Sequence, residues 1–244
     1  MATGPHPRPL EAVVFDFDGL VIDSEWAIFE TAVKGFAAPE LGAAAIRAAG
    51  GKAAGFTVEA WAAGIGINAD TDDSWWPTIC AAAEVSDWSQ EDFEAAYRAE
   101  PRDREDIPLL PGVVELLDVL DTAGVPVGVA SSSSRRWLER HTERHGLVER
   151  FGTLVGSDVV GGVGKPAPDV YLKACADLGA DPRRSVALED SANGTTAAKA
   201  AGMAVVAVPS TITQHNDFSH ADLVVGSLLD LDLDQLRALV ARAD

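Results

Sequence analysis

The chain has 244 residues, of which 47% are hydrophobic and 23% charged, so it fits one α/β domain with a modest insert or two small domains. Its formal charge of −19 argues against nucleic acid or an anionic membrane surface as a partner, because both require a basic footprint. No apolar run is long enough for a membrane span, so we expect none.

Features at the N-terminus and at the cysteines bear on location. Residues 1–9 carry three prolines and no apolar segment of the kind found in a signal peptide, so we expect a flexible tail there. Cys80 and Cys175, the only two cysteines, lie in Ala-rich, helix-like stretches and favour free thiols over a disulfide. We therefore expect a cytoplasmic protein.

A short apolar run, Ala12–Phe15, is followed by two carboxylates, Asp16 and Asp18, and by Gly19. Such a run is typical of a buried strand, and open α/β sheets bind ligands at the C-terminal ends of their strands. A turn at Gly19 would bring both carboxylates into one pocket, where the pair suits Mg²⁺-assisted phosphoryl transfer onto a carboxylate nucleophile. On its own the motif also fits aspartates that only cap a turn.

The strand pattern then stops. Ser24 can N-cap a helix with apolar residues at helical spacing, and no strand is evident before residue 108. Further helix-like segments lie near 54–64, 74–85 and 89–100. We predict an all-helical cap domain over 24–107, inserted into a core domain formed by 10–23 and 108–244.

Strands and helices alternate again after Pro108. Strands are expected at 125–130, 153–156, 185–188, 204–208 and 222–225. Helices are expected from Val113 to just before Gly124 and at 135–145, 169–178, 193–201 and 232–243. Alternation of this kind implies right-handed crossovers, so the predicted fold class is α/β, with a doubly wound, mostly parallel sheet and an inserted helical cap.

Two of the later strands end in polar clusters. One ends in Ser131–Ser134, and the other ends in Glu189 and Asp190, while Lys165 lies on a loop between them and just before a helix. Each has an ordinary explanation when taken alone: a flexible turn, a helix N-cap or a solvated lysine. The clusters would lack a function only if all of these ordinary explanations were correct at the same time, so a shared functional site is favoured.

In chain order, four segments resemble the haloacid dehalogenase (HAD) superfamily of phosphohydrolases: Asp16–Gly19, Ser131–Ser134, Gly164–Asp169 and Glu189–Ser191. More narrowly, they resemble its β-phosphoglucomutase-like and sugar-phosphatase branch, in which a helical cap follows the first motif. The resemblance runs from about Leu10 to the C-terminus. It implies a Rossmann-like core and a Mg²⁺-dependent phosphohydrolase that cleaves a small phosphorylated metabolite, a sugar or polyol monophosphate, through an aspartyl phosphate.

The resemblance also assigns roles to residues. Asp16 would be the nucleophile, and Asp18 would protonate the leaving oxygen and then deprotonate the attacking water, which is typically worth about 10²–10⁴-fold in rate. Ser131 would donate its hydroxyl to a phosphoryl oxygen, and the backbone amides of Ser132 and Ser133 would do likewise.

A cation and a lysine would balance the negative charge of this site. Asp16 and Asp190 are the expected side-chain ligands of Mg²⁺, with the Asp18 main-chain carbonyl, and Glu189 would bind it directly or through water. Lys165 would pair with both the phosphate and Asp16 and so hold the nucleophile ionised and oriented.

The sequence departs from the mutases of this branch in one loop. A β-phosphoglucomutase is expected to carry an Arg and a Ser in a glycine-led cap loop that binds a second phosphate, whereas the matching stretch, 50–57, carries only Lys52 as a cationic candidate. A phosphatase is therefore favoured, with a β-phosphoglucomutase-type phosphotransferase as the alternative. A non-catalytic phosphate-binding regulator is the second alternative. A monomer or weak dimer is expected in either case.

Several remaining residues have weaker assignments. His141 and His145 are spaced like a metal pair on a helix, but no third ligand is evident and a surface or half-buried helix face explains them. Asn193 could touch substrate or merely begin a helix, and Asp23 and Glu25 fit support of the hinge better than catalysis. Five of the six tryptophans fall in the insert and suit the core of a helical bundle, with one ring of the Trp75-Trp76 pair over the active site as the alternative: Trp26, Trp61, Trp75, Trp76 and Trp88.

Overall fold

A computed structural model describes residues 9–25, 74–84, 89–91 and 107–241, together with positions 60, 61, 63, 65 and 95. Within this part, six parallel strands form one sheet in the order β3-β2-β1-β4-β5-β6. The strands are β1 (Ala12–Phe15), β2 (Val127–Ala130), β3 (Thr153–Val155), β4 (Ser185–Glu189), β5 (Ala204–Ala207) and β6 (Leu223–Val224). The prediction of a doubly wound, mostly parallel sheet is confirmed.

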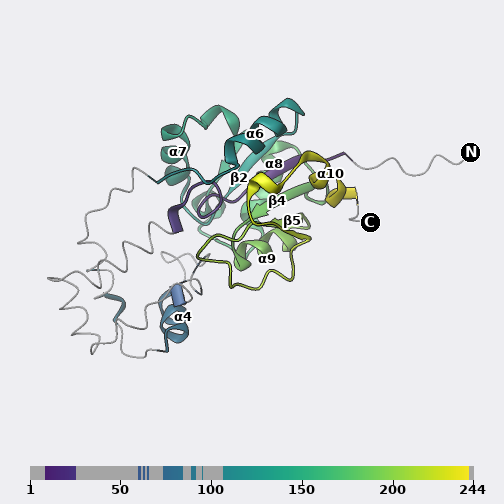
Figure 1. Ribbon diagram of the computed structural model, residues 1–244. Coiled ribbons are helices and arrows are strands. Elements are labelled where there is room, and N and C mark those ends of the chain that lie inside the picture. Colours follow the sequence, from purple (N-terminus) through teal and green to yellow (C-terminus); the bar gives the residue numbers. More distant parts are fainter. Residues whose placement is uncertain are drawn as a thin grey trace, which may run out of the picture.

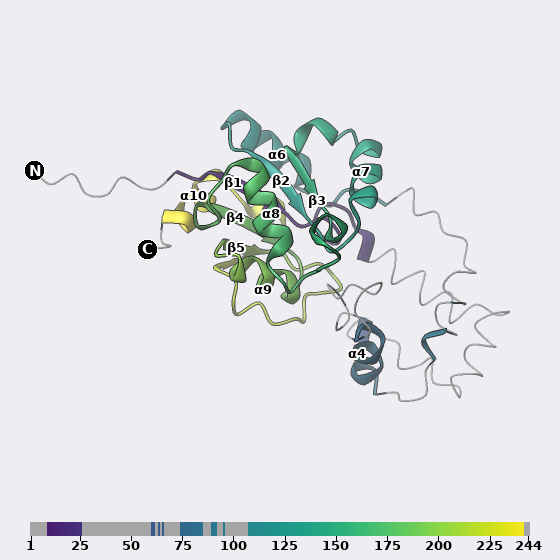
Figure 2. The same cartoon turned by 180° about the vertical axis from the view of Figure 1, so that it is seen from behind.

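Helices cover both faces of the sheet (Figures 1 and 2). Alternate residues of β1 explain this, because Val13 and Phe15 pack into one buried cluster while Val14 packs into the other. The first cluster includes apolar residues of α6 (Val113–Thr122), α7 (Arg135–Arg144) and α10 (Leu233–Ala241). The second includes residues of α8 (Asp169–Leu178) and α9 (Ala192–Ala200).

The strand order places a topological switch point at β1. The chain moves from β1 outward to β2 and β3 on one side and to β4, β5 and β6 on the other. At such a point the loops leave adjacent strands in opposite directions, and a crevice opens beyond their C-terminal ends. The residues after β1 and β4, which pair along Ala12–Phe15, therefore share this crevice.

Most predicted elements occur within one or two residues of their expected bounds. The polar residues at strand ends also start helices, since the Ser134 hydroxyl accepts from the backbone N–H of Trp137 at α7, and the Ser191 hydroxyl accepts from that of Gly194 at α9. The capping explanation was thus right for Ser191, whereas the cap at Ser134, in a segment for which a flexible turn was the alternative, was not predicted. Among the described residues, four short 3₁₀ helices were not predicted: Val148–Arg150, Ser157–Val160, Pro182–Arg184 and Leu228–Asp230.

Few residues of the predicted cap are among those described. The segment expected to be helical at 74–85 contains α4 (Trp75–Ala82), which lies apart from the layered sheet in both views (Figures 1 and 2). Trp61 and Trp76 are buried, as expected for core residues, whereas Trp26, Trp88 and the side chain of Trp75 lie outside the described part. The domain bounds, including the cap at 24–107 and the tail at 1–9, stay predictions.

Two further observations concern location. Cys80 and Cys175 are free thiols, as predicted. Among the residues that the structure describes, no helix combines the length and apolar character needed to cross a bilayer.

Candidate active site

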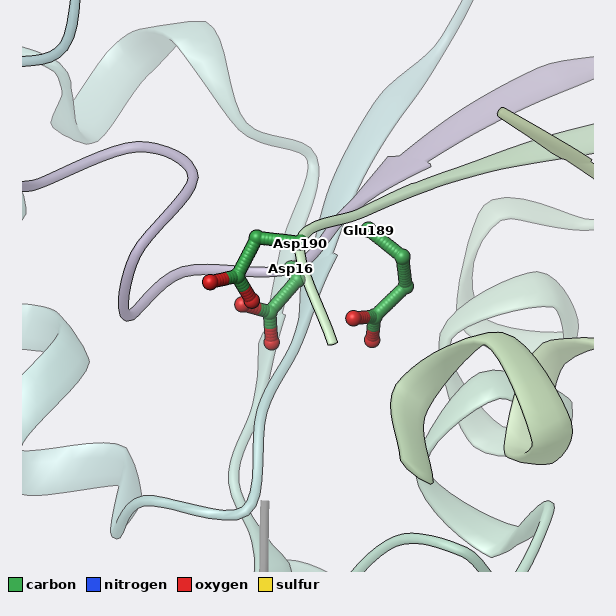
Figure 3. A group of neighbouring side chains, drawn as sticks. All are labelled: Asp16, Glu189 and Asp190. Atoms are coloured by element: carbon green, nitrogen blue, oxygen red, sulfur yellow. The ribbon is translucent and has the colours of Figure 1, made fainter. Parts of the chain in front are cut away.

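The carboxylates predicted at two strand ends meet at the switch point. Asp16 follows β1, while Glu189 closes β4 and Asp190 follows it. One oxygen of each side chain lies within 4.8 Å of the others, and all three residues are buried. Figure 3 shows Asp16 and Asp190 side by side, with the carboxylate of Glu189 directed toward the same space.

Lys165 crosses this cluster. Its ammonium Nζ donates to Oδ1 of Asp16 and, across 2.5 Å, to Oε1 of Glu189, and its side chain is buried. Burial acts to lower the pKa of Lys165, but the charges of Asp16 and Glu189 outweigh it and raise that pKa above its usual value. Lys165 is thus a fixed cation in contact with two of the three carboxylates.

One lysine does not neutralise the cluster. Burial raises the pKa of Asp16 from 3.8 to about 8, in spite of the neighbouring Lys165 charge, and Glu189 raises it further. Burial also raises the pKa of Asp190 well above its usual value, and the charges of Asp16 and Glu189 act in the same direction. The site therefore favours additional positive charge.

A divalent cation fits this set of donors. Buried carboxylate oxygens grouped within a few ångströms are the hard ligands that Mg²⁺ and similar ions prefer. A bound cation would also lower the raised pKa values of Asp16 and Asp190, because it stabilises their charged forms. Among the described residues, Asp16, Glu189 and Asp190 form the group of this kind.

Glycines next to the carboxylates are required by their close contacts. Gly19 has a φ of 85°, and a Cβ built on it would lie 2.3 Å from Oδ2 of Asp190. A Cβ on Gly194 would lie 1.9 Å from Oε1 of Glu189. The expected turn at Gly19 is therefore present, whereas the role of Gly194 could not be seen in the sequence.

Asp18 does not join the three-carboxylate group but lies beside it in a network of donors. Its Oδ1 accepts from the Ser24 hydroxyl at 2.8 Å and from the Trp137 indole Nε1 at 2.9 Å. Its Oδ2 accepts from the Ser133 hydroxyl at 2.7 Å and, more weakly, from that of Ser131 at 3.4 Å. Sequence reasoning missed Trp137, whose position in the first turn of α7 carries no motif signal.

The serine loop after β2 is ordered by the same residues. The backbone N–H of Ser133 donates to the hydroxyl of Ser131 at 3.0 Å, so this amide, which we expected to face a phosphate, is engaged inside the loop. The hydroxyl of Ser132 accepts from the backbone N–H of Lys165 at 3.2 Å. The loop is thereby joined directly to the lysine loop.

Glu25 is a half-buried carboxyl near the cluster. Burial raises its pKa from 4.5 to about 8, and the charges of Asp18 and Asp16 raise it further. Its Cγ lies 3.1 Å from the position that a Cβ on Gly19 would take. Our assignment of Glu25 to hinge support stays a prediction. Its charge acts to raise the pKa of Asp190, so Glu25 contributes to the electrostatics of this site.

The remaining candidates have separate outcomes. His141 is buried, not at the surface, and burial lowers its pKa, while Nε2 of His145 contacts the carbonyl oxygen of Ile107 at 2.9 Å. No metal-binding group among the described residues includes either histidine. Asn193 lies in the first turn of α9, and its Nδ2 donates to the Ile65 carbonyl at 3.2 Å. Lys52 lies outside the described residues.

A doubly wound sheet with a lysine-bridged carboxylate cluster at its switch point is the arrangement of a phosphohydrolase. Comparison with known families agrees, because residues 10–202 match the haloacid dehalogenase-like hydrolase family. The chain belongs to this family, as the resemblance predicted, and it is a phosphatase.

Individual relatives carry phosphatase names. Hexitol phosphatase B of Escherichia coli (strain K12) is 32% identical over 246 residues, which cover 94% of this chain and 98% of that protein. The bifunctional riboflavin kinase/FMN phosphatase of Arabidopsis thaliana is 40% identical over 156 residues, which cover 59% of this chain but only 41% of that relative. The crystal structure of CbbY from Rhodobacter sphaeroides in complex with phosphate is similar, with 28% identity, a TM-score of 0.60 and coverage of 93% of this chain and 99% of that one.

Proposed function

We propose that this phosphatase hydrolyses sugar or polyol monophosphates with Mg²⁺ as its cofactor and Asp16 as its nucleophile. The observation that carries the proposal is the contact of Lys165 with both Asp16 and Glu189, beside Asp190, at the ends of adjacent strands. Phosphate monoesters require a positioned nucleophile and neutralised charge, and this arrangement supplies both.

In the first half of the reaction, a carboxylate oxygen of Asp16 attacks phosphorus and the bond to the leaving oxygen breaks. Lys165 orients Asp16 through its hydrogen bond to Oδ1 and offers its remaining N–H to a phosphoryl oxygen. Asp18 gives its proton to the leaving oxygen, which departs as an alcohol. Asp16 then carries the phosphoryl group as an aspartyl phosphate.

In the second half, water replaces the alcohol. Water attacks the phosphorus of the aspartyl phosphate while Asp18, now ionised, takes a proton from this water. The bond from Asp16 to phosphorus breaks, so inorganic phosphate leaves and the carboxylate of Asp16 is regenerated. Both oxygens of Asp18 accept hydrogen bonds in the structure. At least one of these hydrogen bonds must therefore break before Asp18 can reach the reacting oxygen. The Ser131 hydroxyl would donate to the phosphoryl oxygens once the group is bound.

Mg²⁺, when bound, supplies positive charge that allows an anionic phosphate to approach the carboxylates. Asp16 and Asp190 would hold it, and Glu189 would contact it through water, because both oxygens of Glu189 already accept hydrogen bonds from protein groups. The ion's identity as Mg²⁺ rests on the oxygen-only ligand set and the family.

The substrate class follows from relatives that cover nearly all of the chain. Hexitol phosphatase B is named for polyol phosphates, and CbbY was crystallised with phosphate. A cytoplasmic location fits the free thiols of Cys80 and Cys175. A monomer or weak dimer stays a prediction.

Phosphate release from a panel of sugar and polyol monophosphates tests the function. We expect hydrolysis of several members with Mg²⁺, loss of activity with EDTA, and recovery when Mg²⁺ is restored. Binding of phosphorylated compounds without release of phosphate would refute the enzymatic proposal and favour a phosphate-binding regulator.

A further inference from the structure

A buried tyrosine contacts the lysine and one carboxylate of the cluster. Tyr171 lies in the first turn of α8 and is 0% exposed. Its hydroxyl donates to Oε1 of Glu189 across 2.6 Å, and this same oxygen accepts from Nζ of Lys165. The ammonium of Lys165 also lies 5.0 Å from the centroid of the Tyr171 ring.

The other oxygen of Glu189 is held as well. Its Oε2 accepts from the backbone N–H of Ser191 at 3.3 Å and from the Ser191 hydroxyl at 3.2 Å. Gly194 closes the remaining side, since even a Cβ there would overlap the carboxylate. Glu189 is therefore a fixed acceptor, and Tyr171 and Ser191 determine where it presents Oε1 to Lys165.

We propose that Tyr171 is a positioning residue for phosphoryl transfer: it fixes Glu189 and the ammonium of Lys165 so that Lys165 is directed at Asp16. The proposal rests on the proposed function, in which Lys165 orients the nucleophile and contacts the phosphate.

The chemistry of the contacts explains why the hydroxyl and the ring both matter. A hydrogen bond to a carboxylate is roughly twice as strong as a neutral one, so the Tyr171 hydroxyl restrains Glu189 more than packing alone would. The face of the ring attracts the ammonium of Lys165 and limits its movement away from the cluster. Two of the three N–H groups of Lys165 are then used by Asp16 and Glu189, and the third is left for a phosphoryl oxygen.

Tyr171 is separate from the groups that react. Its hydroxyl is buried and donates to Oε1 of Glu189, so it is not placed to transfer a proton in the reaction. Its action must pass through Glu189 and Lys165. Loss of an outer-shell partner of this kind typically costs about 10–100-fold in activity or metal affinity.

Tyr171→Phe, which removes the hydroxyl and keeps the ring, tests the proposal. We expect kcat for p-nitrophenyl phosphate at saturating Mg²⁺ to fall about tenfold with KM within about twofold, because the substrate still binds but Asp16 is less well directed. Thr142→Val is the matched control, since it removes a buried hydroxyl that bonds only to the backbone of α7. The control should lose stability while kcat stays within about twofold.

Wild-type kcat in Tyr171→Phe would overturn the proposal, as would an equal loss in Thr142→Val. A crystal structure of Tyr171→Phe tests the positioning role independently of the proposed function. Displacement of Glu189 from Lys165 can be seen in the crystal whether or not the protein hydrolyses the substrate. An unmoved Glu189 would also overturn the proposal.

A second measurement needs no destabilising substitution. The chain has two tyrosines, so labelling with 3-fluorotyrosine gives two ¹⁹F signals. The signal that disappears in Tyr97→Phe belongs to Tyr97, and the other belongs to Tyr171. We expect the Tyr171 signal to shift when Mg²⁺ and inorganic phosphate are added to the full-length wild-type chain. A stationary Tyr171 signal in protein that releases phosphate from substrate would count against positioning through Lys165.

Discussion

Trp137 donates its indole N–H to Oδ1 of Asp18 across 2.9 Å and so joins α7 to the loop that follows β1. The two residues are 119 positions apart in sequence. The ring of Trp137 also packs against His141, with 4.1 Å between ring centroids. A residue of the helix that follows the serine loop therefore helps to set the orientation of the proposed acid–base carboxyl.

Trp137→Phe tests this relationship. The phenyl ring keeps contact with His141 but cannot donate to Asp18, so the carboxyl will sample more orientations and kcat should fall about fivefold with little change in KM. Steady-state kinetics at several pH values provide the measurement. Glu139→Gln on the exposed side of α7 is the control, and it should have wild-type kinetics. Identical kinetics for Trp137→Phe and the wild type would show that the other donors suffice.

Asp16→Asn tests the nucleophile. The substitution preserves the shape of the side chain and removes the attacking carboxylate, so we expect turnover to fall below detection while circular dichroism and the unfolding transition remain those of a folded protein. Retention of even a tenth of the wild-type kcat would exclude the aspartyl-phosphate mechanism.

Asp190→Ala tests the metal site. Removing one of the two carboxylates proposed to bind the ion directly should raise the Mg²⁺ concentration for half-maximal activity by about 10–100-fold, measured by titrating Mg²⁺ at saturating substrate. Ca²⁺ should inhibit the wild type, because its larger and looser coordination shell disturbs the in-line geometry. Full activity of the wild type after exhaustive EDTA treatment would contradict the metal assignment.

The pH dependence of Mg²⁺ binding follows from the buried carboxyls. In the folded protein the pKa of Asp16 is raised from 3.8 to about 8. Without the ion, proton binding by Asp16 therefore stabilises the folded state. This contribution is complete below pH 3.8 and is lost as the pH rises through about 8. Mg²⁺ needs the ionised form, so its affinity should rise about tenfold per pH unit for each proton displaced, up to about pH 8. Thermal unfolding should show a larger Mg²⁺-induced increase in Tm at about pH 8 than at about pH 6. Equal increases at both pH values would contradict this linkage.

Sequence reasoning succeeded where a motif follows a strand. The meeting of Asp16 and Asp190 was predictable because parallel strands direct their C-terminal residues to one edge. The place of Lys165 beside them came from the order of the segments in the family resemblance, since this residue lies on a loop. Tyr171 and Trp137 were not predictable, because each lies inside a helix where an aromatic residue at helical spacing is ordinarily core. Only the packing of α8 and α7 against particular strand ends shows which polar atom each ring presents, and that depends on tertiary structure.

The proximity of groups at the site was also not predictable from the sequence. Glu25 lies just after the hinge-like segment and has the pattern of a helix-terminal acid, which gives no sign that its carboxyl lies close enough to Asp18 and Asp16 for their charges to raise its pKa. Likewise, the sequence around Gly194 shows only a glycine near the start of a helix. A side chain is excluded there because the carboxylate of Glu189 occupies the space that a Cβ would need. Close approach between distant segments is the information that local patterns lack.

The last prediction separates a phosphatase from a mutase. Both chemistries form the aspartyl phosphate at Asp16 and differ in which acceptor takes the phosphoryl group. A mutase must hold a sugar phosphate by its distal phosphate and exclude water, which requires a cationic group in the cap. Lys52 is the one cationic candidate in the loop at 50–57, and a lysine lacks the bidentate geometry of arginine.

Water should therefore be the acceptor. We expect release of inorganic phosphate from sugar or polyol monophosphates and little interconversion of β-glucose 1-phosphate and glucose 6-phosphate, both followed by ³¹P NMR in the same reaction. Lys52→Ala should leave kcat for monophosphates within about threefold, because the proposed mechanism assigns contact with the reacting phosphate to Lys165. Isomerisation stimulated by catalytic glucose 1,6-bisphosphate, with negligible phosphate release and with loss of isomerisation in Lys52→Ala, would instead identify a mutase in which Lys52 binds the second phosphate.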